Sequence, residues 1–135
     1  MGKRLFVTAK FKGLENKVEI ENLCQLVKES GFEDFCFVRD VKGYEKAFDD
    51  PKEMMRRAKE EIEKSDALLV DITDKPAGGR ALEVGMAFGL GKKILIIKKK
   101  GTEMKNTWEG VADMVIEYEQ IEDIVTKLKT FLLLM

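Results

Sequence analysis

The chain has 135 residues, with 24 lysines and arginines against 25 aspartates and glutamates, two cysteines and no histidine. A chain of this length can bury one core unaided, so we expect a single domain over residues 1–135. The missing histidine excludes Ser-His-Asp and Cys-His catalysis and any histidine metal site, which leaves proton transfer to carboxylates, lysine, tyrosine or water. The net charge of -1 argues against broad attraction to polymeric nucleic acid or an anionic membrane.

The two cysteines and the amino-terminal segment bear on the compartment. Cys24 and Cys36 lie in apolar surroundings without the spacing of metal ligands, which is typical of a reducing compartment. The first residues, Met1 to Lys12, lack the continuous apolar run of a signal peptide, and the longest apolar runs have the length of strands. We therefore expect a cytoplasmic protein that does not associate with membranes.

Short apolar runs alternate with helical spacing along the chain. In chain order they predict a strand at 5–7, a helix over 18–27, a strand at 35–38, a polar connection over 39–50, a helix from Pro51, a strand at 67–72, a loop over 73–79, a helix over 80–90, strands at 93–97 and 114–116, and a helix over 121–128. Such β-α units predict an α/β fold, a doubly wound (flavodoxin-like or Rossmann-like) parallel sheet of about five strands with helices on both faces. Ligands of these sheets bind beyond the carboxyl ends of the strands, which places residues 8–13, 71–83 and 98–108 around one crevice.

The most informative stretch is DITDKPAGGRALEVGMAFGLGKK, residues 71–93. An apolar strand is followed by an acidic, glycine-containing loop, and we expect Glu83 in the first turn of the next helix. The helix dipole and unpaired backbone N–H groups favour an ionised carboxylate there. An ionised carboxylate at the mouth of a sheet can act as a nucleophile or stabilise a developing cation. The alternative interpretation is that Glu83 only caps the helix.

This stretch resembles the nucleoside 2-deoxyribosyltransferase family, including its branch that hydrolyses 2′-deoxynucleoside 5′-monophosphates. The matching elements are Ser65 and Asp66 before a strand, Gly78 and Gly79 in the loop, Glu83 with Gly85 and Ala87, and Gly91 with Lys92. The resemblance implies that Glu83 attacks C1′ of a deoxyribose and forms a covalent glycosyl-enzyme intermediate, which a second base or water then takes. It also implies a nucleoside or nucleotide substrate, a homodimer or higher oligomer, and no metal or redox cofactor.

The segment FVTAKFKG, residues 6–13, resembles the aromatic residue and Gly-Ser-x-Arg-Gly phosphate loop of the monophosphate hydrolases. Lys12 takes the place of the arginine, where it can neutralise a phosphate but lacks the bidentate fork; a solvated basic turn is the alternative. Ala9 and Lys10 replace the Gly-Ser pair, and Phe6 stands where many members carry tyrosine. The resemblance implies substrate contacts at Phe6, Ala9, Lys10, Lys12, Gly13, Gly78 and Gly79.

A second carboxylate of the family, an aspartate that helps protonate the departing base, corresponds to Ala58. Loss of a general acid removes about 10²–10⁴-fold of rate. Asp71 or Asp74 could substitute as the acid, and Asp71 could equally fix the loop. In the family a later segment reaches the neighbouring subunit's site, which implies substrate contacts from Lys105 and Asn106.

The departures at Ala58 and Phe6 support a second hypothesis about function. The chain would then be a nucleotide-binding or signalling module that keeps the fold and has lost the chemistry. Both hypotheses share the fold and a small nucleotide ligand, and they differ in whether a base is released.

Overall fold

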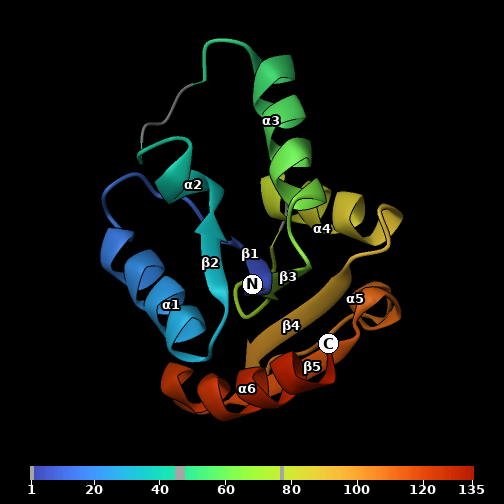
Figure 1. Ribbon diagram of the computed structural model, residues 1–135. Coiled ribbons are helices and arrows are strands. Elements are labelled where there is room, and N and C mark those ends of the chain that lie inside the picture. The colour runs from blue at the N-terminus through green and yellow to red at the C-terminus, as the bar shows by residue number, and fades with distance from the viewer. Residues whose placement is uncertain (1, 45–47, 77) are drawn as a thin grey trace.

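The computed structural model describes residues 2–44, 48–76 and 78–135. Within them, parallel strands form a five-stranded sheet in the order β2-β1-β3-β4-β5, with helices on both faces, which confirms the predicted fold class (Figure 1). The strands are β1 (Arg4–Thr8), β2 (Glu33–Cys36), β3 (Ala67–Asp71), β4 (Lys93–Lys99) and β5 (Met114–Tyr118). The helices are α1 (Lys17–Glu29), α2 (Phe37–Asp40), α3 (Pro51–Glu63), α4 (Gly79–Gly89), α5 (Asn106–Val111) and α6 (Ile124–Leu134), with a 3₁₀ turn η1 (Ile121–Asp123).

The central strands are apolar because both of their faces are covered. In β3, Leu69 faces the core layer under α1 and α6, whereas Leu68 and Val70 face the layer under α3 and α4. Figure 1 shows these two helix pairs on opposite sides of the sheet. Among the described residues, no helix is long and apolar enough to cross a membrane.

The second strand ends two residues earlier than the sequence predicts. Phe37 and Val38, expected in the strand, begin the short helix α2 instead. The carboxylate of Asp40 accepts a hydrogen bond from the backbone N–H of Cys36 at 3.0 Å, which stabilises this reversal of the chain. This local side-chain hydrogen bond therefore outweighs the strand preference of Phe37 and Val38. Part of the expected polar connection, residues 45–47, lies outside the described residues.

Aspartates join the amino ends of neighbouring strands. The carboxylate of Asp66 accepts a hydrogen bond from the backbone N–H of Arg4 at 2.8 Å, and the N–H of Asp66 donates to the Arg4 carbonyl at 2.8 Å. Asp113 makes the same pair of bonds with Ile94, each at 2.8 Å. The aspartate of the Ser65-Asp66 pair therefore holds the register between β1 and β3, the two strands that position the site.

Removal of the Asp66 carboxylate would leave the part-buried N–H of Arg4 without its acceptor. We expect Asp66→Ala to lower the free energy of unfolding by about 1–3 kcal/mol, the cost of an unsatisfied buried donor. Urea denaturation followed by circular dichroism measures this loss. As a control, Glu119→Ala removes only an exposed ion pair with Lys100 and should cost less than about 1 kcal/mol. Equal losses in the two variants would contradict a structural role for Asp66.

Candidate active site

A cavity of about 520 Å³ lies at the carboxyl ends of β1 and β3. The chain leaves β1 toward α1 on one face of the sheet and leaves β3 toward α4 on the other, so the strand order switches here. The apolar part of the lining includes Phe11, Phe37, Met54 and Met55. The polar part comes from the loop after β1, the segment after α2, and the loop that leads into α4. Apolar walls with a few convergent polar groups are typical of a small-molecule site.

Glu83 lines this cavity from α4. Its Oε1 accepts a hydrogen bond from the hydroxyl of Thr8 at 2.6 Å, so the ends of β1 and the β3–α4 unit meet at this carboxylate. Burial raises the pKa of Glu83 to about 7, although the Thr8 hydrogen bond and the charges of Arg80 and Lys42 act to lower it. Near neutral pH the carboxyl is therefore poised between its two protonation states.

The sequence-based expectation for the ionisation of Glu83 is wrong. The helix α4 begins at Gly79, so Glu83 lies beyond the first turn, where the dipole has weakened. The loss of water around Glu83 in the cavity has a larger effect than the helix terminus, so the pKa of Glu83 rises. A carboxylate that has lost water becomes a stronger nucleophile once ionised, so this correction leaves a nucleophilic role chemically feasible.

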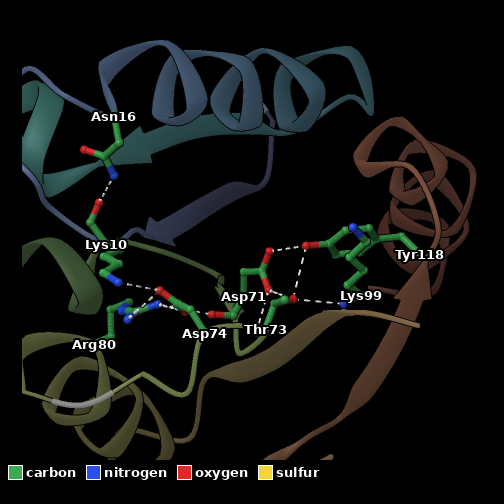
Figure 2. Close-up of polar contacts among 8 residues, drawn as sticks. All are labelled: Lys10, Asn16, Asp71, Thr73, Asp74, Arg80, Lys99 and Tyr118. Atoms are coloured by element: carbon green, nitrogen blue, oxygen red, sulfur yellow. Dashed lines mark hydrogen bonds and ion pairs between the residues drawn. The ribbon is translucent and has the colours of Figure 1, made fainter. Parts of the chain in front are cut away.

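Asp71 has both carboxylate oxygens occupied, as Figure 2 shows. Oδ1 accepts from the backbone N–H of Thr73 at 2.9 Å and from its hydroxyl at 2.6 Å, and Oδ2 accepts from the hydroxyl of Tyr118. Burial and the hydrogen bond to Asp71 raise the pKa of Tyr118 to about 12, so this phenol remains a donor. Asp71 lines a smaller neighbouring cavity of about 110 Å³ and not the larger one. Its geometry favours the interpretation that it fixes the loop.

Asp74 lies between the two cavities and belongs to the lining of both. Its carboxylate accepts hydrogen bonds from Arg80 at 2.8 and 3.3 Å and pairs with the ammonium of Lys10 at 3.3 Å (Figure 2). Burial acts to raise the pKa of Asp74, but the hydrogen bond and charge of Arg80, together with Lys10, outweigh it and lower the pKa. An ionised carboxylate has no proton for a departing base, so this geometry argues against the acid role.

The predicted substrate contacts divide into two groups. Ala9, Lys10 and Gly79 line the large cavity. Phe6 does not, because its side chain is 0% exposed and packs in the core against Phe35, with ring centroids 5.5 Å apart. The structure therefore contradicts direct contact between Phe6 and a ligand.

The other predicted contacts lie outside the lining of the large cavity. They are Lys12, Gly13, Gly78, Lys105 and Asn106. The side chain of Lys12 is exposed, and its backbone N–H donates to Asn16 at 3.0 Å, which holds the first loop against the start of α1. Gly78 has a φ of 56°, a conformation suited to glycine, and precedes α4. Lys105 and Asn106 are exposed where α5 begins.

Sequence reasoning missed most of the positive charge in the cavity. Lys42, Lys75 and Arg80 line it together with Lys10, against the carboxylates of Glu83 and Asp74. Arg80 could have been found from its spacing, because residues three apart share a helix face, whereas Lys42 and Lys75 sit in irregular segments without such a signal. No group of three or more cysteines, aspartates or glutamates in the described part of the chain is arranged to hold a metal ion.

Ala58 also lines the cavity, with 2% of its surface exposed. The position that corresponds to the second carboxylate of the family therefore does face the cavity in which Glu83 lies. A methyl group stands there, so this position supplies neither a proton nor a hydrogen bond.

Comparisons with known proteins agree with this fold. The family model for nucleoside 2-deoxyribosyltransferase matches residues 8–125. A search of curated proteins finds no match. Among solved structures, a CMP N-glycosidase from Clostridium botulinum is 24% identical, with 96% of this chain and 100% of that chain covered and a TM-score of 0.71.

Two further solved structures share the fold at lower identity. A 2-deoxyribosyltransferase from Bacillus psychrosaccharolyticus is 18% identical, with 93% and 95% of the two chains covered and a TM-score of 0.72. A conserved protein from Enterococcus faecalis V583 is 12% identical, with 98% and 100% covered and a TM-score of 0.79. Because the family model spans most of the sequence, this chain belongs to the nucleoside 2-deoxyribosyltransferase family.

Proposed function

We propose that this protein breaks the N-glycosidic bond of a deoxynucleoside or its 5′-monophosphate, by hydrolysis or by transfer of the base, with Glu83 as the nucleophile. The observation that carries the proposal is the position of Glu83, a desolvated carboxylate on the wall of a nucleotide-sized cavity. Family membership supports the same class of reaction. The excess of positive charge in the lining favours the monophosphate over the uncharged nucleoside.

In this mechanism Oε2 of Glu83 attacks C1′, because Oε1 accepts the hydrogen bond from Thr8. The bond from Oε2 to C1′ forms as the bond from C1′ to the base nitrogen breaks, and the electron pair leaves with the base. Water or a second base then attacks C1′ and releases the carboxylate. Thr8 fixes the orientation of the carboxylate and favours its ionised form.

Protonation of the departing base is the demanding step. Ala58 carries no acid, Asp74 is ionised by its two cations, and Asp71 is bonded to Thr73 and Tyr118. The base must then leave with a proton drawn from water or with none, which slows turnover. This observation favours the second candidate function, a nucleotide-binding module without turnover.

Lys105 and Asn106 do not reach the cavity of their own chain. We propose that they serve the site of a second copy in a homodimer or higher oligomer, as the resemblance implies. Their exposure at the start of α5 is compatible with this role.

Release of free base tests the proposed chemistry. The wild-type protein is incubated with each of the four deoxynucleoside monophosphates and the four deoxynucleosides, and free base is quantified by chromatography. We expect release from at least one monophosphate, at a higher kcat/KM than from its nucleoside. Glu83→Gln keeps the shape of the side chain and removes its charge, and it should lower the rate by about 10³-fold or more.

Glu119→Gln, on the exposed surface, is the matched control and should retain the wild-type rate. Base release by Glu83→Gln at the control rate would contradict the role of Glu83. Nucleotide binding in calorimetry without any base release would instead support the binding module.

The pKa of Glu83 sets the pH dependence. Only the ionised carboxylate attacks, so activity should fall as the pH drops through about 7, the raised pKa of this group. Thr8→Val removes the hydrogen bond that favours the charged form, so the pKa should rise above the wild-type value. A carbon NMR titration of the carboxyl groups, with Glu83→Gln to identify the resonance, measures both. A wild-type midpoint near that of exposed glutamates, or a downward shift in Thr8→Val, would contradict this assignment.

A further inference from the structure

We propose that the carboxylate of Asp74 occupies the anion-binding position of the cavity, and that the substrate's phosphate displaces it from Lys10 and Arg80. Asp74 would then be an internal competitor that sets the affinity of this position for phosphate. This inference rests on the proposed function, because it takes the ligand to be a phosphorylated nucleoside.

The contacts of Asp74 are those that a bound phosphate would make. Arg80 directs two nitrogens at the carboxylate, at 2.8 and 3.3 Å, in the bidentate arrangement that guanidinium groups form with carboxylates and phosphates alike. Lys10, in the loop after β1, adds a point charge at 3.3 Å from the same carboxylate (Figure 2). Two cations, one from the loop after β1 and one from α4, therefore converge on one internal anion.

Of the three charged groups, Arg80 is held most firmly, since the side chain of Lys10 is 46% exposed. The side chain of Arg80 is 12% exposed, and it also donates to the backbone carbonyl of Asp71 at 3.3 Å. Asp74 is 38% exposed and sits in the loop before α4. Its neighbour Lys75 has a φ of 55°, a strained conformation for a residue with a side chain. When phosphate replaces the carboxylate on Arg80, Asp74 therefore moves and Arg80 stays in place.

A phosphate is a stronger partner than the carboxylate it replaces. A phosphate monoester carries a charge of about -1.5 to -2 at pH 7 and three acceptor oxygens, so it can bind Arg80 and Lys10 at the same time. An uncharged nucleoside offers no anion for these cations and leaves the Asp74 contacts intact. The internal carboxylate thus lowers the affinity for a ligand whose anion must displace it, and a phosphate offsets that loss through its greater charge.

The direct test is binding of inorganic phosphate, measured by isothermal titration calorimetry at constant ionic strength. Asp74→Asn removes the competing charge and retains the shape of the side chain. We expect its Kd for phosphate to be about tenfold lower than that of wild type, since a single charge near the surface contributes on this scale. Asp74→Ser should shift the Kd in the same direction.

Two further variants make the test specific. Glu119→Gln, with the same change in net charge at a distant exposed site, should leave the Kd unchanged. Lys10→Met should weaken binding about tenfold, because it removes one of the two cations. Circular dichroism melting verifies that each variant is folded.

Phosphate binding by Asp74→Asn and Asp74→Ser that is no tighter than wild type, or undetectable, would overturn the inference, as would wild-type affinity in Lys10→Met. This readout needs no turnover, so it is independent of whether base is released. A protein that binds phosphate as described and releases no base would retain this inference and lose the proposed chemistry.

Discussion

The site depends on one topological constraint, the divergence of the chain after two neighbouring strands. β1 and β3 are hydrogen-bonded along their length, but the connections from their carboxyl ends go to opposite faces of the sheet. The backbone cannot fill the space between those connections, so a cavity remains there. The same divergence places Thr8 at the end of one strand and Glu83 on the helix that follows the other, 75 residues apart in sequence and 2.6 Å apart in space.

Within that cavity, competition between desolvation and charge pairing determines the ionisation of each carboxyl group. Glu83 has one hydroxyl donor and more distant cations, so burial dominates and its pKa rises. Asp74 contacts two cations directly, so pairing dominates and its pKa falls. Two carboxylates on one cavity wall thus have opposite properties, one suited to titrate near neutral pH and the other to remain an anion. The local contacts, and not the residue type, create this difference.

The sequence predicted the architecture well because the fold signal is local and periodic. Apolar runs such as 67–70 favour strands that are buried on both faces, and the motif around Glu83 indicated the helix that carries this residue. The pKa of Glu83 could not be predicted, because desolvation depends on packing by Phe37, Met54 and other distant residues. The partners of Asp71 and Asp74 were hidden for the same reason: Tyr118 comes from β5 and Lys10 from the loop after β1, both far away in sequence. In the irregular loop after β1, the side chain of Lys12 is exposed to solvent, whereas that of Lys10 pairs with Asp74 at the cavity. The spacing of residues in the sequence alone does not determine this difference.

Peptide mass spectrometry can detect the proposed covalent bond between Glu83 and the sugar. The protein is mixed with a deoxynucleoside monophosphate, quenched in acid within the first turnover, and digested for peptide mapping. We expect the mass of the peptide that contains Glu83 to increase by one deoxyribosyl 5′-phosphate, and the mass of the same peptide from Glu83→Gln to stay unchanged. An adduct on any other residue, or base release without any adduct at short times, would contradict it.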